Sequence, residues 1–487
     1  MREKTTYQRV SLEEVFSPRG VAVVGASGSG RMGFPEGVLM GLVEAGCPAV
    51  YPVNPKYREI MGLPCYPTLE SIPGPVDYVV VSIPATGVMT LLEDCAGKGV
   101  KAVQFFTAGF SESGIAQRAD LEREMLAKAR ASGFRIIGPN CVGLFVPKSG
   151  LVNISGVSFE PGPVAFISQS GGHANNIVQF SDFRGIRFSK VVSYGNGLDV
   201  DEIEMLEYFK DDPETKIIAA YIEGIKDGRR FKEALEAAAA VKPVIIYKGG
   251  RTEAGQRAAF GHTASMTSSI AVFEALCRQA NVIQVNDIDE LIDVLVLLSF
   301  ADPLPQGTGM AMIGAGGGPS VLAGDVMEKH SLCLPALSNA IQNELKKVLP
   351  VDGSIFTNPL DTPNMSTPKA ISSAMTIMGK IPEIHTLFYH MGFHPISRWG
   401  INRFMADNYG EQLAQALVEA KASSGKPILL ALRPPGDLGG MEEFLDVQKA
   451  AVDAKIPVFY DLDRLALAVS RVAAWRKNKM AWMKPGT

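Results

Sequence analysis

Short apolar segments that end in a glycine-rich turn recur three times along the chain. They cover residues 20–24, 164–168 and 310–314, and each is followed by a stretch with the apolar period of a helix. Continuous apolar runs of this length are typical of parallel strands that are buried on both faces. A strand, a glycine turn and a helix in this order open a doubly wound α/β domain. The pattern therefore predicts an α/β protein with three such domains.

The three starts lie about 145 residues apart, which is close to the common size of one domain. Further short apolar runs alternate with helical stretches at residues 78–83, 102–106, 217–222 and 244–247. Proline- and glycine-rich segments, typical of linkers, separate the units at residues 147–163 and 301–307. We therefore predict domains at residues 1–150, 160–300 and 308–475.

Composition and charge exclude several classes of protein. The 487 residues are 46% hydrophobic and 20% charged, which is the balance of a soluble globular protein. A net charge of −4 without a long run of one sign argues against nucleic acid or an anionic membrane as partner. Six cysteines form no CxxC pair, and the first residues lack an apolar signal core. We expect a cytoplasmic protein.

The first glycine turn is a candidate nucleotide-binding loop. Ser27, two residues after Gly25, stands where the dinucleotide fingerprint has a glycine. The second strand leads into Lys56 rather than into an acid that would hold a bare ribose. A lysine suits a phosphate-bearing ribose, as in CoA or NADP. The loop alone leaves three interpretations open: CoA or another nucleotide, a nicotinamide cofactor, or a turn that only packs a helix on a strand.

Several strings, in the order in which they occur, resemble the α subunit of ADP-forming acyl-CoA synthetases, which are relatives of succinyl-CoA synthetase. The strings are VVGAS at 23–27, YPVNPK at 51–56, SIPA at 82–85, TAGF at 107–110, GPNCVG at 138–143, ISQSG at 167–171, YIEG at 221–224, GHT at 261–263 and NPLD at 358–361. The resemblance implies a Rossmann-like CoA-binding domain followed by two flavodoxin-like domains, the first of which carries a phosphohistidine loop.

The resemblance also implies ligands and a partner. CoA is expected to bind near Gly25, Ser27, Lys56, Pro84 and Asn140. The ATP-grasp domain of the family has no counterpart in this sequence. A separate β subunit is therefore expected to bind ATP or ADP with Mg²⁺, in a heterotetramer or larger heteromer. The other substrate is expected to be a small carboxylic acid.

His262 is the candidate nucleophile. It stands among small residues, which indicates an accessible loop, and a neutral imidazole is nucleophilic at cellular pH. Residues alone leave a structural histidine equally open, whereas the resemblance implies a phosphohistidine. A carboxylate that accepts the N–H of the other ring nitrogen would fix the tautomer. Glu223 matches the glutamate to which the family assigns this role, and the alternative is a surface acid.

The second glycine turn offers a site for the phosphate on His262. Ser170, Gly171 and Gly172 open a predicted helix whose N–H groups and dipole favour an anion. His173 stands where the family has a small or aliphatic residue, and we expect it either to contact the acid or to cap the helix. His385, His390 and His394 lack the spacing of a metal-binding helix pair, so we expect no metal site on this chain.

The sequence thus predicts an NDP-forming acid–CoA ligase subunit. Two alternatives stay open. An NADP-dependent oxidoreductase would use the same first domain but leaves Glu223 and His262 unexplained. A non-catalytic CoA-binding regulatory subunit would bind CoA while His262 is never phosphorylated.

Overall fold

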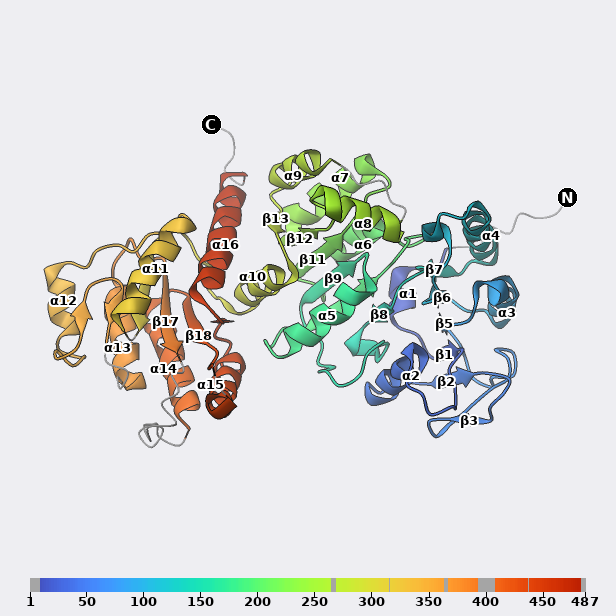
Figure 1. Ribbon diagram of the computed structural model, residues 1–487, viewed down its shortest axis with the longest axis horizontal. Helices are drawn as coiled ribbons and strands as arrows, with labels where there is room; N and C mark the ends of the chain where they lie inside the picture. The colour runs from blue at the N-terminus through green and yellow to red at the C-terminus, as the bar shows by residue number, and fades with distance from the viewer. Residues whose placement is uncertain are drawn as a thin grey trace. The chain divides into compact units, whose positions relative to one another are not determined.

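The chain folds into three sheets flanked by helices. The computed structural model describes residues 9–263, 269–314, 316–362, 367–392, 408–436 and 438–482. Two compact units are formed, Met1–Ile288 with two sheets and Asp289–Thr487 with one (Figure 1). The doubly wound α/β fold predicted from the apolar pattern is confirmed. Among the described residues, no helix is both long and apolar enough to cross a membrane.

The first sheet is parallel throughout and runs in the order β2-β1-β5-β6-β7. Its strands are β1 (Val21–Val24), β2 (Val50–Val53), β5 (Tyr78–Val81), β6 (Ala102–Phe105) and β7 (Arg135–Ile137). The helices are α1 (Leu12–Phe16), α2 (Phe34–Glu44), α3 (Val88–Lys98) and α4 (Ala116–Ser132). Smaller elements are the hairpin of β3 (Glu59–Ile60) and β4 (Leu63–Pro64) and the 3₁₀ turns η1 (Ala85–Gly87) and η2 (Ser111–Ser113).

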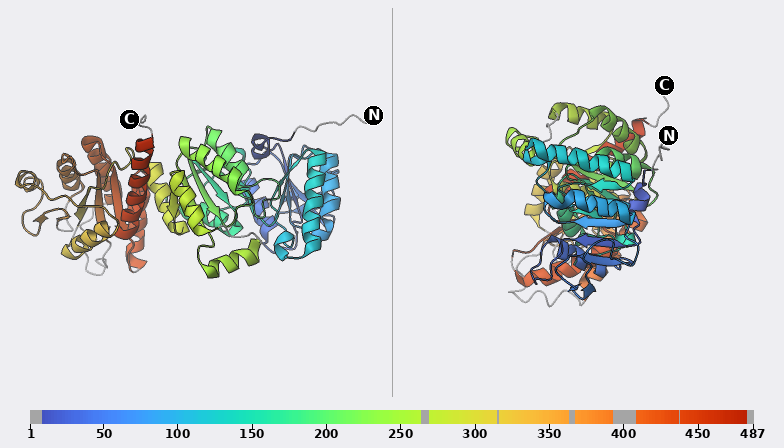
Figure 2. Two further views of the ribbon diagram at one scale, coloured as in Figure 1. Left: turned by 90° about the horizontal axis from the view of Figure 1, so that it is seen from above. Right: turned by 90° about the vertical axis from the view of Figure 1, so that its right-hand side faces the viewer.

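Both faces of this sheet are covered, which explains its continuous apolar runs. Val21 and Val23 of β1 belong to a core with Leu39 of α2. Ala22, which points to the opposite face, belongs to a core with Leu92 of α3. Figure 2 shows α3 and α4 side by side on that face.

The second sheet runs in the order β13-β12-β11-β9-β10-β8. Its strands are β8 (Gly143–Phe145), β9 (Val164–Ser168), β10 (Phe188–Ser193), β11 (Ile217–Ile222), β12 (Val244–Lys248) and β13 (Ile283–Val285). The helices are α5 (Gly171–Asp182), α6 (Glu202–Asp211), α7 (Gly228–Val241), α8 (Glu253–Thr263) and α9 (Ile270–Gln279), with a 3₁₀ turn η3 (Pro147–Ser149). β9 lies between β10 and β11, so the carboxyl ends of β9 and β11 meet at the switch point where such sheets bind ligands.

The two sheets of the first unit share one hydrophobic core. Ile137 of β7 and Ile167 of β9 belong to the same cluster of buried residues. The buried guanidinium of Arg135 crosses the boundary, because it donates to Asp199 Oδ2 at 2.7 Å and to Glu204 Oε2 at 2.7 Å. β8 falls within the range predicted for the first domain, yet it pairs antiparallel with β10 at the edge of the second sheet.

The second unit carries the sheet β15-β16-β14-β17-β18-β19, in which only the edge strand β15 is antiparallel. Its strands are β14 (Met310–Gly314), β15 (Ile355–Phe356), β16 (Leu360–Asp361), β17 (Thr386–Gly392), β18 (Ile428–Arg433) and β19 (Val458–Phe459). The helices are α10 (Ile288–Phe300), α11 (Gly317–Lys329), α12 (Asn339–Leu345), α13 (Pro368–Gly379), α14 (Tyr409–Ser424), α15 (Met441–Asp453) and α16 (Leu462–Trp482), with a 3₁₀ turn η6 (Leu438–Gly440).

Candidate functional site

Two polar residues mark the switch point of the second sheet. Gln169 follows β9 and Glu223 follows β11, and the register places Ser168 beside Tyr221. The Gln169 side-chain oxygen accepts the N–H groups of Glu223 at 2.8 Å and Gly224 at 3.0 Å. The two strand ends are therefore tied together by a buried amide, which fixes the backbone that presents Glu223.

Glu223 is 8% exposed, and all but one of its polar groups make hydrogen bonds with described residues. Its carbonyl accepts a hydrogen bond from Lys248 Nζ at 2.5 Å, and its Oε1 accepts one from the Tyr221 hydroxyl at 3.0 Å. Its Oε2 is buried and has no hydrogen-bond partner among the described residues. A buried carboxylate oxygen without a donor is costly, so this atom is available for a donor from outside the described set.

Lys248 is a buried lysine that the sequence analysis missed. Its ammonium donates to the carbonyls of Glu223 and Gly249, at 2.5 and 2.6 Å. Burial lowers the pKa of Lys248, while the negative charge of Glu223 works in the opposite direction. At the end of an apolar strand a lysine looks like a surface charge, and only the fold shows that it turns back to hold the Glu223 backbone.

Ser170 caps the helix α5, because its Oγ accepts the His173 N–H at 3.4 Å. A Cβ on Gly171 would lie 2.8 Å from Val142 Cγ1, whereas a Cβ on Gly172 would meet nothing closer than 3.8 Å. Gly171 is thus required for packing, and Gly172 leaves the helix end uncovered. The N–H groups of a first helical turn have no acceptor within the helix, so this end can receive an anion.

His173 lies beside the Tyr221 ring, with the ring centroids 4.3 Å apart, and its centroid is 5.8 Å from that of Tyr247. Its Nδ1 is buried without a hydrogen-bond partner among the described residues. Burial lowers the pKa of His173, which favours the neutral ring. The structure thus places His173 in an aromatic cluster that borders Glu223.

His262 lies in the last turn of α8, and its side chain is outside the part of the chain that the structure describes. Its proposed role stays a prediction. Arg251, which stands upstream of His262, donates to Asn286 Oδ1 and to Glu274 Oε1. The Arg251 guanidinium is therefore partly neutralised by its ion pair with Glu274.

The first glycine loop has the close packing that a glycine-rich turn requires. Gly25 has φ +104°, and a Cβ there would lie 2.4 Å from the Ser82 carbonyl oxygen. Ser27 Oγ lies 3.3 Å from the Tyr57 hydroxyl, and Asn54 Nδ2 donates to the Ala26 carbonyl at 2.8 Å. The turns after β1 and β2 are therefore joined.

Lys56 and Pro84 lie on the turns that border this loop. The Lys56 side chain is exposed and makes no ion pair with the described residues. Pro84 is an exposed residue at the start of η1, at the carboxyl end of β5. Because Gly25, Ser27, Lys56 and Pro84 all follow parallel strands of one sheet, they share its carboxyl edge.

Glu36 is a second residue that the sequence analysis missed. One oxygen accepts the Ser27 N–H at 2.6 Å, and the other accepts the Gly33 N–H at 2.9 Å. Pro35, in the first turn of α2, supplies no N–H at all. A carboxylate thus accepts two N–H groups at the helix end where the dinucleotide fingerprint places a pyrophosphate. The spacing of Gly33 and Glu36 resembles a capping box, which was the available signal.

Asn140 lies where the two sheets of the first unit meet. It has φ +58°, and its N–H donates to the Thr107 carbonyl at 3.1 Å. A Cβ on Gly195, in the loop after β10, would lie 2.4 Å from the Asn140 carbonyl oxygen. Val142, two residues further on, packs against Gly171. The segment therefore links the turn after β6 with the start of α5. Cys141 is buried, which raises the pKa of its thiol to about 12.

In the second unit, the NPLD string has structural roles. Asn358 Nδ2 donates to the Met310 and Pro335 carbonyls at 2.9 and 3.0 Å. Asp361 Oδ1 accepts the Gly316 N–H at 2.6 Å. These bonds fix β14 and the glycine turn that follows it.

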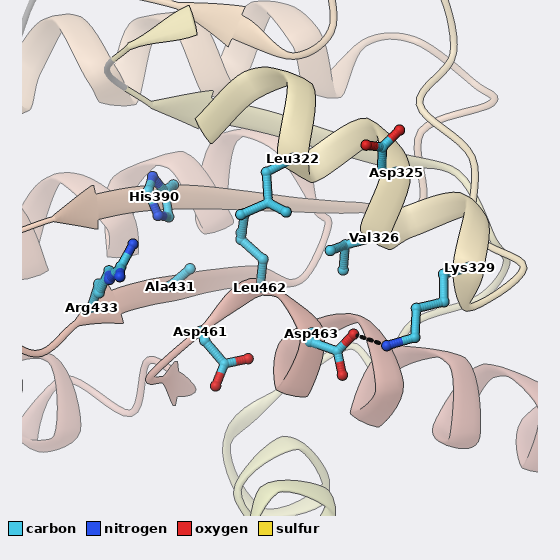
Figure 3. A pocket seen from close by; sticks show the side chains of 10 residues that line it. All are labelled: Leu322, Asp325, Val326, Lys329, His390, Ala431, Arg433, Asp461, Leu462 and Asp463. Atoms are coloured by element: carbon cyan, nitrogen blue, oxygen red, sulfur yellow. Dashed lines mark hydrogen bonds and ion pairs between the residues drawn. The ribbon is translucent and has the colours of Figure 1, made fainter. Parts of the chain in front are cut away.

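A cavity of about 540 Å³ lies in the second unit at the carboxyl ends of β17 and β18, between α11 and the start of α16 (Figure 3). Its wall includes His390, Arg433 and the ion pair of Lys329 with Asp463, at 2.6 Å. Across the described residues, no group of three side chains could hold a metal ion. Of the three histidines discussed in the sequence analysis, His394 lies outside the described residues.

Comparisons with known proteins agree with this arrangement. Residues 19–147 match the model of a CoA binding domain, and residues 161–298 match that of a succinyl-CoA ligase like flavodoxin domain. The α subunit of acetate–CoA ligase (ADP-forming) II of Pyrococcus furiosus is 40% identical over 72% of this chain and 76% of the relative. The α subunit of the corresponding enzyme I is 34% identical over 96% of this chain and 99% of the relative.

A solved structure extends the likeness to the whole fold. The dinucleotide forming acetyl-coenzyme A synthetase 1 of Ca. Korarchaeum cryptofilum, in complex with phosphate and ADP, superposes with a TM-score of 0.79 at 29% identity. The match covers 98% of this chain and 100% of that one. Together with the sequence identities, this similarity shows that the chain belongs to the ADP-forming CoA ligases, in the family of their α subunits.

Proposed function

We propose that this chain is the CoA-binding, phosphohistidine-carrying α subunit of an acid–CoA ligase that catalyses acid + CoA + ATP ⇌ acyl-CoA + ADP + phosphate. The observation that carries the proposal is Glu223 Oε2, which no described residue bonds and which is buried at the switch point where Ser170, Gly171 and Gly172 open α5. A carboxylate that can accept an imidazole N–H next to an anion-binding helix end is what a phosphohistidine needs.

From acyl-CoA, a phosphate oxygen attacks the thioester carbonyl, and the CoA thiolate leaves. The product is an acyl phosphate. Asn140, which lies where the two sheets of the first unit meet, would lie beside the acyl phosphate as it forms. One ring nitrogen of His262 then attacks the phosphorus, and the carboxylate of the acid leaves. The other ring nitrogen keeps its proton, which Glu223 Oε2 accepts as a hydrogen bond while positive charge develops on the ring. The N–H groups at the start of α5 stabilise the phosphoryl oxygens.

The phosphoryl group then passes from His262 to ADP. We propose that this occurs on a separate ATP-grasp β subunit in a heterotetramer or larger heteromer, because the relatives named α subunit imply a partner. Mg²⁺ would accompany the nucleotide there. CoA would lie over the first sheet, with its phosphates near Ser27 and Lys56, and Gly25 and Pro84 beside it. His173 would border the acid.

The test is phosphorylation by γ-labelled ATP in the complex of the chain with its nucleotide-binding partner. We expect acid-labile label on the wild-type chain and none on His262→Ala. Label that persists in His262→Ala would refute the phosphohistidine. CoA binding without any label would indicate the regulatory subunit, and binding of NADP in place of CoA would indicate the oxidoreductase.

A further inference from the structure

We infer that Tyr221 is a positioning residue for phosphoryl transfer: its hydroxyl holds one oxygen of Glu223, so that the other oxygen is the one presented to His262. The inference rests on the proposed function, because it assigns a task within the same site. Tyr221 opens the YIEG string, but in the sequence it is indistinguishable from one more apolar position of a buried strand.

The first argument is that Glu223 has one vacant acceptor and three occupied groups. Its N–H donates to Gln169, its carbonyl accepts from Lys248, and its Oε1 accepts from Tyr221. Only Oε2 lacks a partner among the described residues. Gln169 and Lys248 bond only to the backbone of Glu223. Tyr221 is therefore the residue that determines which carboxylate oxygen already accepts a hydrogen bond.

The second argument is that the Tyr221 hydroxyl remains a donor. Burial, and next the negative charge of Glu223, raise the pKa of Tyr221 well above its ordinary value. The phenol therefore keeps its proton at any pH at which the enzyme would work. A hydrogen bond of 3.0 Å from a neutral phenol to a carboxylate is charge-assisted.

The third argument is that the Tyr221 ring has little freedom to move. It lies between the His173 ring, with centroids 4.3 Å apart, and the Tyr247 ring, with centroids 5.0 Å apart. A Cβ on Gly249 would lie 2.6 Å from the Tyr221 hydroxyl oxygen and 3.2 Å from Glu223 Cγ. The space that allows the Tyr221 hydroxyl to reach Glu223 therefore exists because Gly249 has no side chain.

Loss of the hydroxyl has a consequence that loss of packing does not have. Without that donor, Glu223 Oε1 has no partner among the described residues, and the orientation of the carboxylate is no longer fixed. Oε2 would then be presented to His262 for only part of the time, so phosphorylation would be slower than in the wild type. Other ionisable side chains near Glu223 are Lys248 and Tyr247 on β12 and Tyr194 after β10, and all are retained in Tyr221→Phe.

The experiment is single-turnover phosphorylation by γ-labelled ATP in the complex, as a function of ATP concentration, for the wild type, Tyr221→Phe and Tyr247→Phe. For Tyr221→Phe we expect a maximal rate about 10- to 100-fold lower at neutral pH. We expect the ATP concentration that gives half of this rate to stay that of the wild type, because Tyr221 acts on Glu223 and not on the nucleotide. Tyr247→Phe removes a hydroxyl from the same aromatic cluster that does not bond to Glu223, so its maximal rate should match the wild type.

Thermal unfolding separates positioning from folding. Tyr221→Phe keeps the ring but leaves the buried Glu223 Oε1 without its donor, so its Tm should fall by a few degrees at most while the chain stays folded. A wild-type rate in Tyr221→Phe would overturn the inference. An equal loss of rate in both phenylalanine variants would also overturn it. Neither result bears on the proposed function, which the labelling of the wild type and of His262→Ala tests separately.

Discussion

Gly195 allows a sharp test of how closely the two sheets of the first unit must approach around Asn140. A Cβ there would lie 2.2 Å from the Pro139 carbonyl oxygen and 2.4 Å from that of Asn140. Gly197 is a matched control, because its φ of +57° is close to the +51° of Gly195, while its Cβ would meet nothing closer than 3.2 Å. The two alanine variants therefore share the backbone strain and differ in steric overlap.

The magnitudes follow from these distances. Both alanines cost about 1–2 kcal/mol for left-handed backbone. In Gly195→Ala the Asn140 loop must retreat by about 1 Å, and such overpacking adds about 1–3 kcal/mol. For a unit of this size, each 1 kcal/mol lowers the Tm by about 2–4 °C. A reacting group displaced by about 1 Å loses on the order of 100-fold in rate.

The assays are thermal unfolding and kcat/KM for CoA in the complex. Gly195→Ala should unfold several degrees below Gly197→Ala and should lose far more activity with CoA. If the two variants unfold together and react with CoA equally well, the contact between the loops does not position Asn140.

Two further predictions concern stability. Arg135→Met should destabilise the chain by about 3 kcal/mol, because the buried carboxylate of Asp199 and the partly buried one of Glu204 keep only the exposed Arg9 as cation; urea unfolding measures this, and a loss below about 1 kcal/mol would contradict it. Asp77→Asn tests pH dependence. The Arg19 hydrogen bond lowers the pKa of Asp77, so the stability from this carboxylate is present above about pH 4 and is lost as the pH falls through the lower folded pKa. Wild type and variant should therefore differ at pH 7, and the difference should shrink as the pH falls below about 4; a difference that does not shrink there would refute the assignment.

The apolar pattern predicted most of the fold because parallel strands covered on both faces leave few polar positions. Val21–Val24, Val164–Ser168 and Met310–Gly314 are strands in the structure as predicted. β8 could not be predicted, because three residues are too few to show a periodic apolar pattern. Their pairing with β10 also depends on contacts between segments distant in sequence.

Sequence reasoning named the residues whose type suggests a chemical role, but not those that hold them in place. It named Glu223 and the loop from Ser170 to Gly172, which lie together at one switch point in the structure; their roles stay predictions. Tyr221 and Lys248 were missed, because an aromatic or lysine at a strand end has several ordinary explanations. Period two places Tyr221 and Glu223 on the same face of the strand, which could have suggested the pair.

The core shared by the two sheets of the first unit restricts how a phosphoryl group can travel. Hinge opening between the sheets would bring Ile137 and Ile167 into water and break the Arg135 ion pairs. Acyl transfer and histidine phosphorylation would therefore share a stationary platform. A phosphoryl group would then have to leave this platform by a movement other than a hinge between the two sheets.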